Sequence, residues 1–424
     1  MTTKVRMYKT QLHISTQEQA NFFQDCFSAK NYLYNLYLRT QFGLLYTRHK
    51  LYPDDAEYKK LDKQVKDQFF LSGFSFEKEF NHVIRVSNTF PQWILKLPQK
   101  TRKQAFIEAD TAFKRYFKGL AGSPRYKGKG AVRSCYFDGS IHIERDRVKL
   151  PKLGWIRLSE YGYLPTDIQL AQKDCHITGC WVKEDCGKYY ITIMTNEEQQ
   201  FDPYKLNSNK VVGVDLGIKD LAITEDKTYI NITKTSYYKH LENYKKLWEK
   251  RFNRRIAYLK RELGIFRIGR HTTKGIATAR RQMKKWRKKL RQVNSNYIRQ
   301  VTASIVKQKP TAIVLENLNV KGMKSNPKLA PSIQKLGFYQ FKDWLTWLCK
   351  KHGIELRQVS QWYPSTKICS NCGFYNHEQF KHKLTDLAVR EFHCNNCSTT
   401  IDRDLNASKN LANAKDYEIL VPAI

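Results

Sequence analysis

Two kinds of residue in this chain of 424 residues are spaced in ways that suit metal ions. Four cysteines form two Cys-x-x-Cys pairs, Cys369 with Cys372 and Cys394 with Cys397, and 21 residues separate the pairs. Two such pairs at this distance are typical of a tetrahedral zinc site. A full set of four thiolates leaves no coordination position open for chemistry. We therefore expect a structural Zn²⁺ in a zinc finger over residues 369–397.

Three acids stand where buried elements are expected to end. Asp215 follows the apolar run 211–214 and precedes a turn and a second apolar run at 221–223, which predicts a hairpin. Glu316 ends the short apolar strand predicted over 311–316, and Asp404 lies at the start of a predicted helix. Carboxylates are hard oxygen ligands that suit Mg²⁺. The three acids together predict a site for two Mg²⁺ ions that leaves positions for a phosphate and a water.

The charge of the chain indicates what such a site would act on. The formal net charge is +36 and the isoelectric point is near 9.7, so a polyanion is the expected partner, and nucleic acid is the commonest one. Residues 239–291 contain 20 Lys or Arg against 3 acids, a net of +17. Their apolar residues recur at helical spacing, which predicts two basic helices joined by a Gly-rich turn at 269–275.

We expect two segments to contact nucleic acid. The first is the loop 122–130, where basic side chains surround one tyrosine, a combination that suits a phosphate backbone with one stacking ring. A solvated basic linker is the alternative interpretation of this loop. The second is the pair of basic helices. The candidate contact residues are Arg125, Tyr126, Lys127, Lys129, Arg254, Arg255, Lys284 and Lys285.

The elements that must position these residues follow a recognisable order. Residues 2–13 alternate as a half-exposed strand does, and a long helix of about thirty residues is predicted to begin near Thr16. Further helical stretches are predicted at 56–90 and 98–119. Short strands between 131 and 200 predict a β-barrel or sandwich, to which the N-terminal strand could return. The helical block would then be an insertion into this barrel.

The sequence contains no run of about 18 apolar residues and no apolar stretch of the signal-peptide kind near Met1. We therefore expect no membrane partner and a location in the cytoplasm, that is, in a prokaryotic cytosol or nucleoid. In that compartment the six cysteines outside the two pairs are expected to be reduced thiols.

The motifs together resemble those of the TnpB (OrfB-type) proteins of insertion sequences, which are related to type V CRISPR effectors. The residues that carry the resemblance are Val212–Asp220, Ile313–Leu318, the cysteine motif beginning at Tyr363 and the segment Asp402–Ala407. The segments Ser123–Lys127 and Leu150–Ile156 are similar as well, so the resemblance covers nearly the whole chain. Ser398 departs from the family pattern, in which glycine is common after the fourth cysteine.

The resemblance implies a multidomain α+β protein. Residues 1–15 and 120–205 would form the β-barrel called the wedge domain, interrupted by a helical recognition domain at 16–119. Residues 206–368 and 398–424 would form a RuvC-like nuclease domain of the RNase H fold, with a basic helical insertion at 239–308. The zinc finger, 369–397, would be inserted into that domain.

By the same resemblance, Asp215, Glu316 and Asp404 match the three RuvC acids. Asp402 is a neighbour of the third, and Asp404 is preferred because the family motif places the acid two residues before an asparagine, here Asn406. The implied activity is that of an RNA-guided DNA endonuclease with a guide RNA from the transposon end. It would cut double-stranded DNA beside a short flanking motif through Mg²⁺-dependent hydrolysis of a phosphodiester.

Three alternatives remain at this point. An RNA-guided DNA-binding protein or repressor would have the same fold, although loss of cleavage would be expected to remove an acid. A transposase that joins DNA ends would use a similar triad. An actin-like ATPase shares the pattern around Asp215, but neither the charge of +36 nor the four cysteines serves that function.

Overall fold

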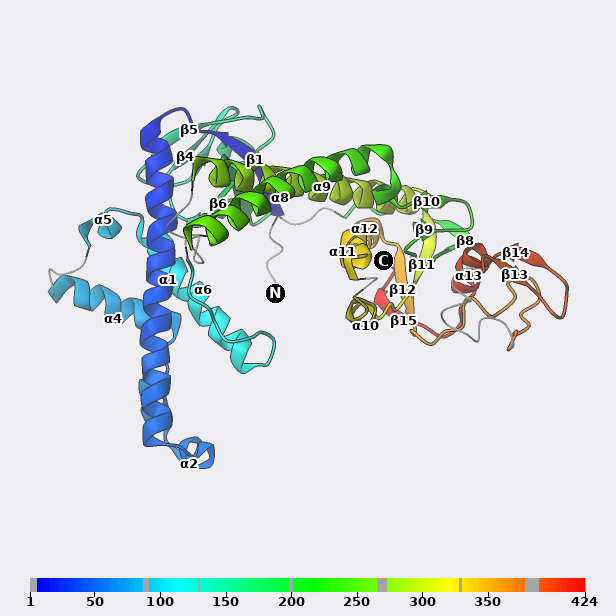
Figure 1. The fold of residues 1–424 in the computed structure, drawn as a ribbon, viewed down its shortest axis with the longest axis horizontal. Coiled ribbons are helices and arrows are strands. Elements are labelled where there is room, and N and C mark those ends of the chain that lie inside the picture. The colour runs from blue at the N-terminus through cyan, green and yellow to red at the C-terminus, as the bar shows by residue number, and fades with distance from the viewer. Residues whose placement is uncertain are drawn as a thin grey trace. The chain divides into compact units, whose positions relative to one another are not determined.

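The computed structural model describes residues 6–86, 91–128, 130–197, 201–264, 273–327, 330–377 and 389–423 (Figure 1). The chain divides into two compact units, residues 1–199 and 200–424. Both contain sheets and helices, so the α+β class is confirmed. The two units are described separately.

The first unit is built on one seven-stranded sheet in the order β2-β6-β7-β1-β5-β4-β3. The predicted return of the N-terminal strand is confirmed, because β1 pairs antiparallel with both β5 and β7. Of the strands that the structure describes, β2 and β3 lie at the ends of this order, so closure into a barrel stays a prediction. The strands are β1 (Arg6–His13), β2 (Ser134–Phe137), β3 (His142–Ile143), β4 (Arg147–Leu150), β5 (Gly154–Leu158), β6 (Ile177–Asp185) and β7 (Lys188–Thr195).

The helices of the first unit follow the prediction in part. The long helix α1 (Gln17–Leu51) begins after Thr16, whose hydroxyl accepts a hydrogen bond from the backbone N–H of Gln19. The single stretch predicted at 56–90 is wrong, because extended backbone at 61–62 and at Phe70 divides it. The remaining helices are α2 (Asp55–Lys60), α3 (Lys63–Phe69), α4 (Gly73–Val86), α5 (Gln92–Leu95), α6 (Gln99–Phe117) and the short α7 (Asp167–Ala171).

The second unit contains a four-stranded sheet in the order β15-β12-β11-β8. Strand β11 (Pro310–Glu316) pairs parallel with both β8 (Asn207–Val214) and β12 (Glu355–Val359), and β15 (Glu418–Val421) pairs antiparallel with β12. The hairpin of β9 (Asp220–Ile223) and β10 (Thr228–Ile230) continues this sheet beyond β8, because Asp215 forms a bridge with Ile223. The hairpin predicted around Asp215 is confirmed.

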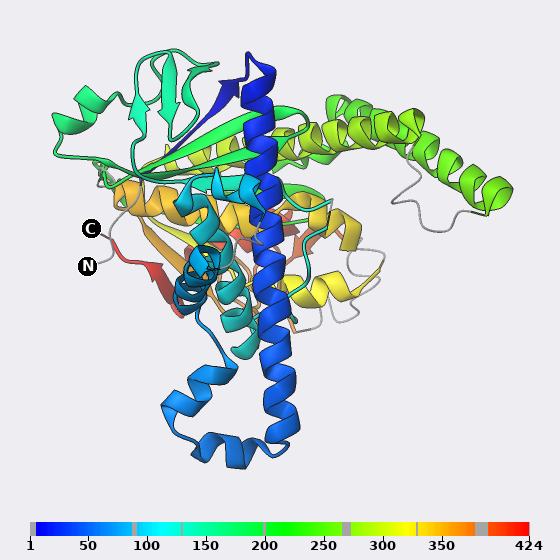
Figure 2. The same cartoon turned by 90° about the vertical axis from the view of Figure 1, so that its left-hand side faces the viewer.

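Helices cover this sheet and extend from it. The two predicted basic helices are present as α8 (Ser236–Leu263) and α9 (Lys274–Val306), which lie side by side in both views (Figure 1, Figure 2). Of the turn predicted at 269–275, residues 269–272 lie outside the described residues. The other elements of this unit are η1 (Ile232–Lys234), α10 (Val320–Ser325), α11 (Ala330–Leu336), α12 (Phe338–His352), β13 (Glu391–His393), β14 (Thr400–Asp402) and α13 (Arg403–Ala412).

Candidate metal centres and nucleic-acid interface

Asp215, Glu316 and Asp404, here called the acid site, come from three elements of the second unit. Asp215 directly follows β8, and its backbone N–H and C=O both pair with Ile223, at 3.0 and 2.8 Å. Glu316 is the last residue of β11, the strand beside β8. Because β8 and β11 are parallel, both acids lie at the carboxyl edge of the sheet, where α/β folds commonly place active groups.

The third acid is brought to this edge by a close approach of helix α13 to strand β8. A Cβ atom at Gly213 would lie 2.0 Å from the carbonyl oxygen of Ser408 and 2.5 Å from the backbone nitrogen of Ala412. Only glycine therefore allows the backbones of strand and helix to lie this close. Asp404 is in the first turn of α13, so the packing at Gly213 determines its distance from Asp215.

The other two acids act electrostatically on Asp215. Burial, together with the negative charges of Asp404 and Glu316, raises the pKa of Asp215 to about 7. Burial also raises the pKa of Glu316. Like charges in a desolvated setting are unfavourable unless a cation is bound between them, and their carboxylate oxygens are the ligands that Mg²⁺ prefers. By its donor chemistry, the acid site suits divalent cations.

Asp404 contacts two arginines in this structure. One Asp404 oxygen accepts a hydrogen bond from Arg390 at 3.1 Å, and the other accepts bonds from Nε and a terminal nitrogen of Arg403 at 3.2 and 3.1 Å. Asp402 has a different role. It caps α13, since one of its oxygens accepts from the backbone N–H groups of Asp404 and Leu405, both at 3.0 Å. Asp402 therefore caps the helix that carries Asp404, and its charge also raises the pKa of Asp215.

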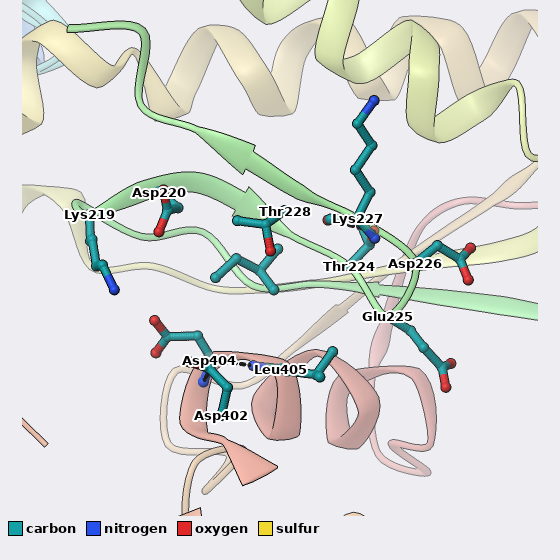
Figure 3. A pocket seen from close by; sticks show the side chains of 11 residues that line it. Lys219, Asp220, Thr224, Glu225, Asp226, Lys227, Thr228, Asp402, Asp404 and Leu405 are labelled. Atoms are coloured by element: carbon teal, nitrogen blue, oxygen red, sulfur yellow. Dashed lines mark hydrogen bonds between the residues drawn. The ribbon is translucent and has the colours of Figure 1, made fainter. Parts of the chain in front are cut away.

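A pocket of about 350 Å³ adjoins the acid site through Asp404 (Figure 3). One wall is the first turn of α13, with Asp402, Asp404 and Leu405. The opposite wall is the β9–β10 hairpin, where Lys219 and Asp220 lie across from Asp404. The pocket is open and polar, and it provides room beside Asp404 for a charged substrate.

Cys369, Cys372, Cys394 and Cys397, here called the cysteine cluster, are already gathered. All four sulfur atoms lie within 4.8 Å of one another, and the pairs Cys369–Cys397 and Cys372–Cys394 are both separated by 3.6 Å. Tetrahedral zinc with bonds of about 2.3 Å requires sulfur atoms about 3.8 Å apart. The spacing of the sulfur atoms is therefore close to that of a tetrahedral zinc site. Of the described residues, no other group of His, Cys, Asp and Glu forms such a cluster.

The sulfur atoms have different surroundings, which shift the pKa values of two of the thiols in opposite directions. A hydrogen bond with the Thr399 hydroxyl lowers the pKa of Cys397 to about 5, whereas burial raises the pKa of Cys369 to about 11. Both knuckles end in the same backbone geometry. Gly373 and Ser398 have φ values of 76° and 54°, and their N–H groups donate to the carbonyls of Cys369 and Cys394. The left-handed position explains why glycine is favoured there.

Two buried asparagines of α13 connect the cysteine cluster to the acid site. The Asn406 amide donates to the carbonyl of Ile368 and accepts from the N–H of Ser370, at 2.7 and 2.9 Å. One turn later, Asn410 donates to the carbonyls of Ser365 and Ile368. In the sequence, Asn406 served only to identify Asp404 as the third acid. Its i,i+4 spacing from Asn410 was the available signal for this connection.

The candidate nucleic-acid residues on the basic helices are placed on the surface. Arg254, Arg255, Lys284 and Lys285 are all exposed, although Arg255 also donates to the carbonyl of Gly275 and so joins α8 to α9. The helices bury Leu259, Ala279 and Met283 along one stripe. The remaining surface of the pair therefore presents charge to solvent.

The loop 122–130 is less uniform than predicted. Arg125 and Tyr126 are exposed, but the Lys127 ammonium group bonds Glu108 at 2.9 Å and lies 3.7 Å from the centre of the Tyr34 ring. Asn35 also holds the backbone of Lys127. These contacts favour a structural role for Lys127 within the first unit. Lys129 lies outside the described residues.

Carboxylates at the ends of parallel strands, a cysteine cluster and a basic helical pair are together typical of a metal-dependent protein that acts on nucleic acid. A family model described as the Cas12f1-like TNB domain matches residues 338–411. Those residues include α12, β12, the cysteine cluster and most of α13.

The names of similar proteins agree with this family match. A putative RNA-guided DNA endonuclease of Streptomyces pristinaespiralis is 25% identical over 317 residues, covering 73% of this chain and 69% of that protein. The putative RNA-guided DNA endonuclease InsQ of Escherichia coli K12 is 23% identical over 340 residues and covers 76% of each. TnpB-like protein L79 of Acanthamoeba polyphaga mimivirus is 37% identical over 106 residues, or 23% of this chain and 18% of that protein. These matches confirm the resemblance to TnpB-type proteins, a family related to type V effectors.

A solved structure of a Cas12f1–sgRNA–target DNA complex aligns with 98% of this chain and 99% of that one, with 14% identity and a TM-score of 0.47. Within the described ranges, no helix combines the length and the apolar character needed to cross a membrane.

Proposed function

We propose that the chain is an RNA-guided DNA endonuclease of an insertion sequence. It cuts double-stranded DNA next to a short flanking motif by two-metal hydrolysis of a phosphodiester. The names of the relatives support an RNA-guided nuclease role. The observation that carries the cleavage step is the acid site itself, in which the charges of Asp404 and Glu316 act on the buried carboxyl group of Asp215.

The strand order supports the RNase H interpretation of this unit. Three antiparallel strands, β10, β9 and β8, are followed by the parallel strands β11 and β12. We propose the domain boundaries given by the resemblance: a wedge domain at 1–15 and 120–205, a recognition domain at 16–119, and a RuvC-like domain at 206–368 and 398–424 around the zinc finger at 369–397.

In the proposed mechanism, Asp215, Glu316 and Asp404 would hold two Mg²⁺ ions, which would activate a water and stabilise the leaving oxygen. The chain's own residues perform the remaining tasks. Asp402 fixes the first turn of α13 and so the direction of Asp404. Arg390 and Arg403 neutralise Asp404 and must yield at least one of its oxygens when cations bind. Zn²⁺ would be held by the cysteine cluster and would have a structural role only.

The proposed partners are a guide RNA from the transposon end and a double-stranded DNA target. Guide pairing would read the sequence, while the protein would read the flanking motif and the shape of the heteroduplex. The exposed arginines and lysines of α8 and α9 supply sequence-independent phosphate contacts, which explains the excess charge of this segment.

The proposal is tested with the complex purified from its native locus. RNA that copurifies is sequenced, and the complex is assayed on a DNA library with randomised flanking positions. We expect one discrete RNA, one enriched flanking motif and Mg²⁺-dependent double-strand breaks. Asp215→Ala should lower the cleavage rate by about a thousandfold or more while RNA binding remains, and Asp416→Ala, an exposed acid beyond α13, should cut normally.

The same assay separates the alternatives. Guided binding without breaks in the wild-type complex would favour a repressor. Joined DNA ends in place of breaks would favour a transposase. Absence of a discrete copurifying RNA would contradict the guided part of the proposal, and normal cleavage by Asp215→Ala would contradict the site.

A further inference from the structure

A single indole is largely exposed to solvent on the loop that follows β12. Trp362 is 81% exposed, far more than a tryptophan that contributes to a core. From residue 348 to residue 373, all of which the structure describes, it is the only large apolar side chain that is exposed. Tryptophan presents a large flat ring, and one that is exposed on a well-anchored loop is available to a ligand.

The loop that carries Trp362 starts at the carboxyl edge of the sheet. Strands β11 and β12 are parallel, and Val359 is the register partner of Glu316. The N–H of Asn317 also donates to the carbonyl of Val359 at 3.1 Å. Trp362 follows Val359 by three residues, so their Cα atoms are at most about 10 Å apart. The indole therefore emerges near the strand end that carries Glu316.

The same loop is fixed to the helix that carries Asp404. The hydroxyl of Tyr363, the residue after Trp362, donates to the carbonyl of Asn410 at 3.0 Å, and the Asn410 amide donates to the carbonyl of Ser365 at 2.7 Å. Within the loop, the N–H of Trp362 donates to the Ser360 hydroxyl at 3.3 Å. The position of Trp362 is thus set relative to Glu316 through β12 and relative to Asp404 through α13.

The surroundings of the indole suit a nucleobase better than a protein partner. Residues 360–369 contain no acid and one basic residue, Lys367, in a unit that also carries the basic helices. Protein hot spots are surrounded by further contacts that exclude water, whereas Trp362 has polar exposed neighbours in Ser360 and Gln361. A base needs only one flat ring face, and stacking tolerates any sequence.

We propose that Trp362 is a base-stacking residue: its indole holds an unpaired base of the DNA strand that enters the acid site, and so positions the neighbouring phosphate. The inference rests on the proposed nuclease function for the identity of the strand. The stacking itself does not depend on the nuclease function and can be observed without cleavage.

The first experiment measures binding in the cleavage-inactive Asp215→Ala complex with its copurified RNA. A DNA target with an unpaired strand is titrated. Adding Trp362→Ala should weaken binding roughly 5- to 150-fold, the range expected for loss of one stacked base, and Trp362→Phe should retain most of the affinity. Trp347, a half-exposed indole on α12 of the same unit, supplies the matched control, and Trp347→Phe should bind as the parent does.

The second experiment uses fluorescence and needs no cleavage. The chain has 8 tryptophans, so the emission of Trp362 is obtained as the difference between the wild type and Trp362→Phe. Addition of a single-stranded thymidine oligonucleotide to the purified complex should quench this difference signal. The corresponding signal of Trp347, from Trp347→Phe, should not change.

Equal affinity of the parent and Trp362→Ala, or an unquenched Trp362 signal, would overturn the inference even if the wild-type complex cuts DNA. Quenching of the Trp362 signal by a wild-type complex that does not cut would support stacking and count against the nuclease proposal instead. Zinc content and melting temperature of Trp362→Ala should equal those of the parent, because a side chain that is 81% exposed contributes little to the core. Loss of binding together with loss of zinc would assign Trp362 to the fold and reject stacking.

Discussion

The cysteine cluster and the acid site share helix α13 and lie in the same unit, yet they are built in different ways. The cysteines come from two short knuckles within 29 residues, and their sulfur atoms are already spaced for zinc. The acids come from residues 215, 316 and 404, and one of them contacts two arginines. A structural ion needs a closed site that local sequence can form. A site for exchangeable cations and substrate must stay open, and distant elements must hold it.

The largest expected effect comes from breaking the cysteine cluster. In Cys394→Ser, Zn²⁺ should be lost and the knuckles should unfold, since structural zinc contributes on the order of 10 kcal/mol to small domains. Cleavage should fall with it, because the Asn406 and Asn410 contacts then lose their partners. Elemental analysis and limited proteolysis around residues 369–397 check this. Cys175→Ser, outside the cluster, is the control, and one zinc per chain in Cys394→Ser would refute the assignment.

Gly213→Ala should break the acid site while the cysteine cluster remains. The added methyl group would meet the carbonyl of Ser408 at 2.0 Å, so α13 must move away from β8. We expect a loss of about 1–3 kcal/mol or more in the free energy of unfolding, and a loss of cleavage with zinc content unchanged. Gly43→Ala makes the same change in α1, where nothing lies within 4 Å. If Gly213→Ala cuts as the wild type does, the close approach does not determine the site.

The pH dependence of the free energy of unfolding is a further way to compare the acid site with the cysteine cluster. The pKa of Asp215 is about 7 in the folded chain and near 3.8 in the unfolded one, so the folded state binds this proton more tightly. Its contribution to stability is therefore present below about pH 4 and is lost as the pH rises toward 7. In chelator, thermal unfolding followed from pH 4 to 7 should show this loss, on the order of a few kcal/mol.

Asp215→Asn, which cannot titrate, should flatten the profile, and Mg²⁺ should restore stability to the wild type at pH 7 but much less to the variant. Identical profiles for both proteins would show that Asp215 is not buried among like charges.

The smallest effect concerns Ser398, which occupies a left-handed backbone position at φ 54°. Glycine has no steric penalty there, so Ser398→Gly should stabilise the finger by about 1 kcal/mol. Gly373→Ala, at the equivalent position of the other knuckle with φ 76°, should have the opposite sign. Melting temperatures of the zinc-loaded proteins decide this. A shift of the same sign in both variants would contradict the symmetry of the knuckles.

Local sequence was sufficient wherever a feature depends on neighbours in the chain. The spacing of the four cysteines, the apolar runs before Asp215 and Glu316, and the capping threonine of α1 were all predicted from short segments. The basic helices α8 and α9 were predicted as well, because charge and helical period are local. Strand β6 has no local signal of this kind, since its buried residues do not alternate regularly along 177–185.

Tertiary structure decided the rest, because the deciding contacts join residues far apart in the chain. Pairing with Glu108 turned Lys127 from a candidate nucleic-acid contact into a residue held within the first unit. Capping of α13 gave Asp402 a role of its own. The sequence alone named the acids and the cysteines. The packing of α13 on Gly213, which brings the acids to one edge, depends on backbones almost 200 residues apart, and no local pattern encodes such a distance.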